Sequence, residues 1–167
     1  MYDDDVGSRF AAALTLAAVL WAATILAVPL FADAAPAFSA TVYAGSSRIC
    51  HQRPDRSFHL AGLPMPVCGR CAGLYFAGAL GALLGWVVTR HVDVGRRQLM
   101  LLVAAAPTAF TWSLEFSGIW AFSNTARALA ALPLGLVGGW LFVQLLRYDA
   151  PLDGVEIHDS RPRARSH

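Results

Sequence analysis

Four apolar runs dominate the chain, and short polar segments separate them. The runs cover residues 10–31, 73–89, 99–122 and 127–146. A helix needs about 20 apolar residues to cross the hydrocarbon core of a bilayer, so each run is long enough, or nearly so, to span a membrane. The second run is the shortest, and we expect its helix to begin within or just after the turn at residues 68–71. The pattern therefore predicts an all-α membrane protein, a bundle of four transmembrane helices with a Cys/His-rich loop on its outer side.

Small residues recur on one face of the second and fourth predicted helices. Ala77, Gly81 and Gly85 lie four positions apart, and Gly135 and Gly139 repeat that spacing. Small side chains let two helix backbones approach closely, which is a common way for helices to associate in lipid. We therefore expect the second and fourth helices to be in contact.

The remaining segments complete one domain, residues 1–147. Segment 33–49 is rich in Ala, Ser and Gly and should lie at the surface or the membrane interface, and residues 148–167 should form a disordered polar tail. Ala32-Asp33-Ala34 has the small-x-small form of a signal cleavage site. The first run nevertheless has the length of a full span and follows an acidic leader, so we interpret it as a membrane anchor.

Composition and charge limit the compartment and the partners. Hydrophobic residues make up 56% of the chain and charged residues 14%, which is too few charges for a soluble domain. The net charge of +2 indicates no nucleic-acid partner. Three arginines lie in the short turn at 90–97, and basic residues in short loops mark the cytoplasmic side. We predict a multi-pass protein of the cell membrane with both termini cytoplasmic and residues 50–71 extracytoplasmic.

Chemically active residues gather in the stretch 50–73, which contains all three cysteines and two histidines. The spacing Cys-x17-Cys-x2-Cys supplies three sulfur ligands from two chain segments. A histidine can complete a tetrahedral zinc site with sulfur distances of about 2.3 Å. We therefore predict Cys50, His51, Cys68 and Cys71 as zinc ligands. His59 is a rival for the fourth position, because two adjacent residues must bend sharply to bind one ion.

The same cysteines permit two other interpretations. Cys68 and Cys71 could be the catalytic pair of a membrane thiol-disulfide oxidoreductase that passes electrons to a quinone, since such enzymes carry a CxxC pair at the outer end of the second of four helices. Those enzymes use a second cysteine pair, and here only Cys50 remains, so the balance is against an enzyme. The third interpretation is a metal-free structural or partner-binding protein, in which Cys68 is bonded to Cys50 or Cys71.

Polar residues are expected beside the cysteines, at the outer ends of the helices. Counted from Leu99, Glu115 lies roughly 24 Å along the third helix and so near the outer interface. Ionisable groups at such positions usually pair, and we expect a Glu115–Arg127 ion pair between the third and fourth helices. The residues predicted to support the metal ligands are Arg56, Arg70, Glu115, Asn124 and Arg127. Loop arginines can also bind anions, so the predicted partners are the lipid bilayer and an anionic lipid or a partner membrane protein.

One set of residues resembles the signature of a known family. The set consists of Cys50, His51, Gln52, Pro54, Arg56, Ser57, Phe58, Gly62, Pro66, Val67, Cys68, Arg70, Cys71, Gly73 and Tyr75. In these positions the chain resembles the small prokaryotic membrane proteins grouped as domain of unknown function 2085. The similarity continues more loosely through Pro107, Gly118, Asn124, Arg127 and Gly135. The resemblance implies a membrane protein with the same motif boundaries, and it implies no particular activity.

The third predicted helix departs from that family pattern. Thr111-Trp112 stands where the family has Asp-Gly, and Glu115 stands where the family has Gln. A carboxylate is therefore one helical turn nearer the outer face in this chain, so no catalytic role of the family's aspartate position carries over to it.

Overall fold

The computed structural model describes residues 3–90 and 92–148. Within these residues, four helices are long and apolar enough to cross a membrane: Val6–Leu30, Gly69–Val87, Val94–Phe116 and Asn124–Tyr148. The predicted all-α membrane fold is therefore confirmed. The predicted polar tail, residues 148–167, lies outside the described residues except for Tyr148.

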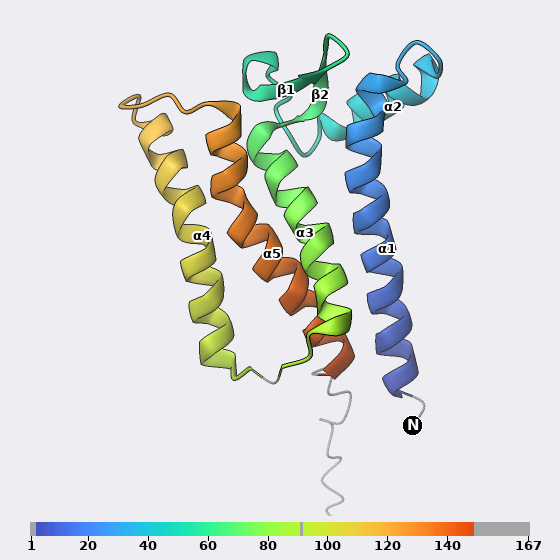
Figure 1. The fold of residues 1–167 in the computed structure, drawn as a ribbon, viewed down its shortest axis with the longest axis vertical. Helices are drawn as coiled ribbons and strands as arrows, with labels where there is room; N and C mark the ends of the chain where they lie inside the picture. The colour runs from blue at the N-terminus through green and yellow to red at the C-terminus, as the bar shows by residue number, and fades with distance from the viewer. Residues whose placement is uncertain (1–2, 91, 149–167) are drawn as a thin grey trace, which may run out of the picture.

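The long helices stand side by side, and the loop elements gather at one end (Figure 1). In chain order the elements are α1 (Asp3–Leu30), α2 (Pro36–Ser46), the short 3-10 helix η1 (Pro54–Arg56), β1 (Ser57–Leu60), β2 (Leu63–Cys68), α3 (Gly69–Val87), α4 (Val94–Phe116) and α5 (Asn124–Tyr148). The strands and α2 lie at the end opposite the start of α1 and the α3–α4 turn. The cysteine-bearing loop and the arginine-rich turn are therefore at opposite ends of the bundle.

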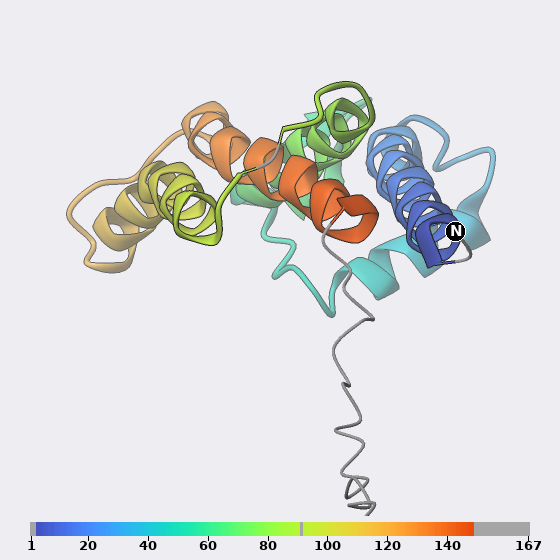
Figure 2. The ribbon, with the colours of Figure 1, turned by 90° about the horizontal axis from the view of Figure 1, so that it is seen from below.

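Helices α3 and α5 form the centre, with α1 and α4 on their outer sides (Figure 2). Glycines bring the two central helices together. A Cβ atom added to Gly81 would clash with the carbonyl oxygen of Leu136, and one added to Gly139 would clash with that of Gly78. Such contact of backbone with backbone is open only to glycine. The predicted contact between the second and fourth spans is confirmed.

Two helix boundaries differ from the limits of the apolar runs. Helix α3 begins at Gly69, before the apolar run starts at residue 73 and within the turn at 68–71 as expected, because Cys68 has extended backbone angles (φ −70°, ψ 163°) and is the N-cap residue. Arg70 and Cys71 consequently lie in its first turn. Helix α4 covers Val94–Phe116 rather than 99–122. Gly118, at φ +70°, ends it, so the apolar residues that follow form a loop at the end of the bundle that carries the strands.

The loop between α2 and α3 contains a β-hairpin that the apolar pattern did not predict. Strands β1 and β2 pair antiparallel, with Leu60 opposite Leu63. Between them Ala61 and Gly62 have φ values of 51° and 81°. Two successive left-handed residues form the type I′ turn that suits the twist of a two-residue hairpin. Two prolines in β2 remove backbone donors, which makes the strand hard to recognise from sequence.

A small apolar core joins the hairpin to the helices. Its buried members are Ile25, Cys50, Met65, Val67, Cys68 and Ala72. At its side Trp21 of α1 meets Tyr75 of α3 edge to face, with ring centroids 6.0 Å apart. Because two of the cysteines belong to this core, the hairpin, α1 and α3 hold them in place together.

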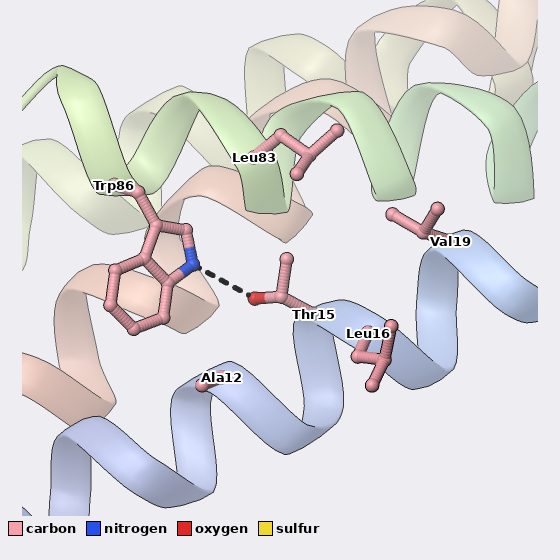
Figure 3. Close-up of a pocket in the computed structure, with 6 residues that line it drawn as sticks. All are labelled: Ala12, Thr15, Leu16, Val19, Leu83 and Trp86. Carbon is pink, nitrogen blue, oxygen red and sulfur yellow. Dashed lines mark hydrogen bonds between the residues drawn. The ribbon is translucent and has the colours of Figure 1, made fainter.

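Nearer the other end, α1 and α3 face each other across an apolar hollow of about 400 Å³ (Figure 3). The residues that line it are Ala12, Thr15, Leu16, Val19, Leu83 and Trp86. Across this hollow the indole Nε1 of Trp86 donates to Thr15 Oγ1 at 3.1 Å. Helix α1 is thus attached to α3 at two levels, by this hydrogen bond and by the core under the hairpin.

Candidate metal centre

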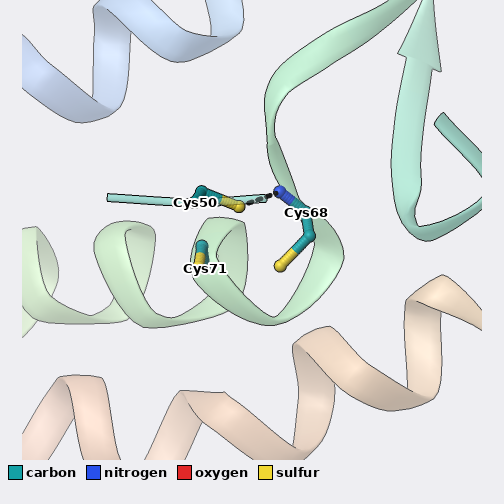
Figure 4. A group of neighbouring side chains, drawn as sticks. All are labelled: Cys50, Cys68 and Cys71. Atoms are coloured by element: carbon teal, nitrogen blue, oxygen red, sulfur yellow. Dashed lines mark hydrogen bonds between the residues drawn. The ribbon is translucent and has the colours of Figure 1, made fainter. Parts of the chain in front are cut away.

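The three cysteines converge where the hairpin meets α3 (Figure 4). Cys50 follows α2, Cys68 ends β2, and Cys71 lies in the first turn of α3. Their three sulfur atoms all lie within 4.8 Å of one another, and none of them is in a disulfide. Among the described residues, this is the group of side chains whose ligand atoms could hold a metal ion.

Gln52 holds the segment of Cys50 against β2. Its backbone is left-handed, with φ 47°, which turns the chain sharply after His51. Its side-chain Nε2 donates to the carbonyl oxygens of Tyr43 at 2.7 Å and of Pro66 at 2.9 Å. The amide therefore bridges α2 and β2, and the turn that it stabilises places Cys50 beside Cys68.

Backbone and thiol groups around the sulfur atoms favour the thiolate form of Cys68. The backbone N–H of Cys68 donates to Cys50 Sγ at 3.2 Å. The hydrogen bond with the Cys71 thiol, opposed by burial, lowers the pKa of Cys68 to about 5, and the Cys71 backbone N–H, Cys50 and the charge of His51 add to this lowering. Thiolate is the form of cysteine that binds metals and attacks disulfides.

The two candidate histidines have different positions. His51 is exposed, and its Nδ1 lies 3.6 Å from Cys50 Sγ. His59 is exposed on β1, opposite Pro64. In the described part of the chain, neither ring joins the three sulfur atoms in one group of mutually close ligand atoms. The fourth ligand stays a prediction, and the geometry favours His51 because its ring is already beside one sulfur.

The donor set suits zinc. In a tetrahedral site with Zn–S bonds of about 2.3 Å, neighbouring sulfur atoms are about 3.8 Å apart. The three sulfur atoms, within 4.8 Å of one another, need only small side-chain movements to reach that spacing. Cys50 and Cys68 are buried and Cys71 is half-buried, so the site is enclosed on its protein side. Three soft thiolates with one imidazole are a common ligand set of structural zinc sites.

A charged network lies beside the cysteines, at the C-terminal end of α4. Glu115 is almost fully buried, and its Oε2 accepts from Arg70 at 2.9 Å. Its Oε1 accepts from Arg127 Nε at 2.7 Å, so the predicted Glu115–Arg127 ion pair is present. Asn124 accepts from Arg127 at 2.7 Å and donates to the carbonyl oxygen of Ser57 in β1 at 2.9 Å. The network thus connects α3, α4, α5 and the hairpin.

Four of the five residues predicted to support the metal ligands belong to this network, and Arg56 does not. Its Nε is 3.9 Å from Asp55, and its side chain lines a hollow beside Glu115. Among the described residues, no hydrogen bond connects the side chains of the network to the three sulfur atoms. Arg70 is nevertheless between Cys68 and Cys71 in the chain, so its ion pair with Glu115 restrains the turn that carries two of the cysteines.

Two residues of the site had no structural role predicted for them from the sequence. Gln52 belongs to the family signature, and its place directly after Cys50-His51 was the signal for a role in the site. Thr111, whose hydroxyl accepts from Arg70 at 3.5 Å and donates within α4, stood out only as a departure from the family pattern. The hairpin had one signal, the turn residues Ala61-Gly62 between two leucines.

Comparison with known proteins supports the membrane class. A family model described as "Predicted membrane protein (DUF2085)" matches residues 50–141, more than half of the chain. An uncharacterized protein of Methanocaldococcus jannaschii is 31% identical over 107 residues, which cover 63% of this chain and 65% of that protein. An uncharacterized protein of Methanothermobacter thermautotrophicus is 30% identical over 88 residues, which cover 53% of this chain and 78% of that protein. The chain thus covers just under two thirds of the length of the Methanocaldococcus jannaschii protein. No solved structure matches the chain.

Proposed function

Since this chain belongs to the family DUF2085 of membrane proteins, we propose that it is a membrane protein that binds zinc through Cys50, Cys68, Cys71 and a histidine. The observation that carries the proposal is the convergence of three sulfur atoms from two chain segments within 4.8 Å. A structural disulfide uses two sulfurs, so a third sulfur at the same point is better explained by a metal ion. The low pKa of Cys68 supplies a thiolate for binding at neutral pH.

The proposed site has a structural consequence for the loop. Four protein ligands form a closed zinc site that leaves no open position for a substrate. The ligands come from the segment after α2, from the end of β2 and from the start of α3. Such a site connects the hairpin to the N-terminal end of α3. It adds to the hydrogen bonds that Gln52 makes across the same region.

Metal analysis of purified protein tests the proposal. We expect about one zinc ion per chain in the wild type and its loss in Cys68→Ser, because a site with two remaining thiolates binds far more weakly. Ser47→Ala is the control, since Ser47 is exposed and bonds only to its own helix. Equal, near-zero metal in the wild type and in Cys68→Ser would refute the proposal.

A matched pair of histidine variants identifies the fourth ligand. His51→Ala is expected to weaken zinc binding, because the His51 ring is already 3.6 Å from one sulfur. His59→Ala is expected to bind zinc as the wild type does, because this ring is exposed on β1. The opposite result in a competition titration with a zinc chelator would assign the fourth position to His59.

We further propose that the metal site faces the outside of the cell membrane, with both termini in the cytoplasm. The support comes from charge: Arg90, Arg96 and Arg97 lie in the α3–α4 turn, at the end of the bundle opposite the cysteines. Short loops rich in arginine stay on the cytoplasmic side.

A thiol-disulfide oxidoreductase is the second candidate, and the low pKa of Cys68 beside Cys71 favours it. In that reaction the two thiols form a disulfide, and two electrons and two protons reduce a quinone to a quinol. Alkylation of free thiols would then depend on whether oxidised or reduced quinone is added. Thiols that do not respond to quinone would exclude this function. If cysteine variants also fold normally and the wild type holds no metal, the remaining interpretation is a metal-free structural or partner-binding protein.

A further inference from the structure

A polar hollow at the outer end of α4 has no part in the proposed zinc site. Its volume is about 220 Å³, and Arg56, Trp112, Glu115 and Phe116 line it. Three of these residues belong to the last two turns of α4, and Arg56 belongs to η1. Because the candidate span of α4 ends at Phe116, the hollow lies at the level where a bilayer places its phosphate groups.

The charges around the hollow are not balanced. Glu115 is the carboxylate in its wall, and it already bonds two cations, Arg70 at 2.9 Å and Arg127 at 2.7 Å. Each carboxylate oxygen is therefore occupied, and the pair of arginines exceeds the carboxylate by one positive charge. Arg56 adds a further positive charge at the same hollow. An anion that enters here is attracted, although one carboxylate is part of the wall.

Arg56, which lines the hollow, has hydrogen-bond donors to spare. Its side chain is 32% exposed, and its nearest carboxylate, Asp55, is 3.9 Å away and is shared with Arg53 at 3.2 Å. Within the described chain, the Arg56 guanidinium makes no hydrogen bond. Free guanidinium donors suit a ligand rich in acceptor oxygens, because hydrogen bonds from arginine to phosphate are charge-assisted.

We propose that this hollow binds the phosphate group of an anionic phospholipid. The phosphate oxygens take up the free donors of Arg56, and the net negative headgroup offsets the excess positive charge. Trp112 and Phe116 stack with ring centroids 5.1 Å apart and are 52% and 79% exposed. These rings provide an apolar wall next to the charges, which suits a ligand that is a phosphate at one end and a hydrocarbon chain at the other.

Lipid binding to the full-length protein, measured by native mass spectrometry, tests the proposal. The wild type is expected to retain phosphatidylglycerol in preference to phosphatidylcholine. In Arg56→Gln the affinity for phosphatidylglycerol should fall about tenfold, because one charge-assisted donor group is lost. Arg53→Gln is the matched control from the same loop, since Arg53 is exposed, pairs with Asp55 and does not line the hollow. Arg56→Lys keeps the charge and should restore part of the preference.

The possible results separate the sources of phosphate. Equal retention of the two lipids by the wild type, or equal losses in Arg53→Gln and Arg56→Gln, would overturn the proposal. Displacement of bound lipid by millimolar inorganic phosphate, without any preference for the lipid form, would overturn the assignment to a phospholipid. Unchanged helical circular dichroism of each variant shows that the loss is not unfolding. The zinc content is a separate readout, so failure here leaves the proposed metal site unaffected.

Discussion

Cys68 connects the backbone geometry of the site to its chemistry. As the N-cap residue of α3 it has extended backbone angles, which direct its side chain toward Cys50 and Cys71. Its low pKa arises mainly from the hydrogen bond with the Cys71 thiol, against the opposing effect of burial. The interactions that stabilise the Cys68 thiolate suit it equally to bind a metal ion and to attack a disulfide. Which of these it does depends on whether a metal ion or a disulfide reaches the sulfur.

The pKa of Cys68 predicts a pH dependence for the metal-free protein. Its folded pKa is about 5, below the 9.0 of a free thiol, so folding releases a proton from this group. The corresponding contribution to stability is complete above about pH 9 and declines as the pH falls toward 5. We expect ultraviolet absorbance of a thiolate to disappear near pH 5 in the wild type and to be absent from Cys68→Ser at neutral pH. A thiolate signal lost near pH 9 would contradict this.

The two ion pairs of Glu115 predict a large loss of stability when its carboxylate is replaced by an amide. Glu115→Gln leaves Arg70 and Arg127 without a counter-charge at the outer ends of three helices. We expect the free energy of unfolding in detergent to fall by about 2–3 kcal/mol, less than for a pair deep in a protein because the network lies at the membrane surface. Asp55→Asn, which removes an exposed partner of Arg53, should have little effect. Equal thermal shifts for the two variants would show that the network does not stabilise the fold.

At the scale of elements, the close contact between α3 and α5 depends on glycines, whose side chain is a single hydrogen atom. Gly138 and Gly139 are adjacent in α5 but have different surroundings. A Cβ at Gly139 would meet the Gly78 carbonyl oxygen and lie 2.9 Å from the Ala82 nitrogen, whereas a Cβ at Gly138 would have nothing within 4 Å. The backbone of a neighbouring helix cannot move aside as a flexible side chain can, so the two positions should respond differently to alanine.

This difference gives a matched test of helix packing. Gly139→Ala is expected to lower the free energy of unfolding by about 1–3 kcal/mol, through overpacking against α3. Gly138→Ala should be neutral or stabilising by up to about 1 kcal/mol, because alanine favours helix more than glycine does. Denaturation of both variants in the same detergent measures the difference. Similar stabilities would mean that α3 and α5 are not in backbone contact.

The hairpin shows how far an element can be predicted from its residues. Its turn, Ala61-Gly62, has left-handed backbone angles that suit a two-residue hairpin, but Pro64 and Pro66 argue against a strand. Both prolines are tolerated because β2 has one paired neighbour, β1, and its other edge needs no donors from them. The strand could be recognised only once its single partner was known.

At the scale of the whole molecule, the two ends of the bundle carry different chemistry. The cysteines, the hairpin and the Glu115 network are at one end, and the arginine-rich turn is at the other. In the orientation proposed above, a cysteine introduced at Ser117 lies outside the cell and one introduced at Thr89 lies inside. Both positions are exposed, so neither should disturb the fold.

Labelling of intact cells with a membrane-impermeant maleimide tests that orientation. Ser117→Cys should add labelling above that of the parent protein, whose native cysteines set the background. Thr89→Cys should be labelled only after the cells are permeabilised, because the α3–α4 turn is then in the cytoplasm. The reverse pattern would place the metal site on the cytoplasmic side.

The amino-acid sequence was sufficient to predict the membrane class, the approximate spans and the pairing of α3 with α5. These properties follow from hydropathy and from the spacing of small residues, which depend on neighbours along the chain. The start of α3 was placed correctly within residues 68–71. The end of α4 was less predictable, because the left-handed backbone of Gly118 ends the helix although the apolar residues continue.

The assembly of the site depends on contacts between distant parts of the chain. Cys50 reaches Cys68 because Gln52 turns the chain and bonds across to β2. Arg70 forms an ion pair with Glu115, which is 45 residues away in the chain. Both contacts join residues that no periodicity relates, since they depend on how the hairpin sits on the helices. The sequence could therefore name the reactive residues, with His51 ahead of His59 as the fourth ligand, whereas the distances among the three sulfur atoms came from the folded chain.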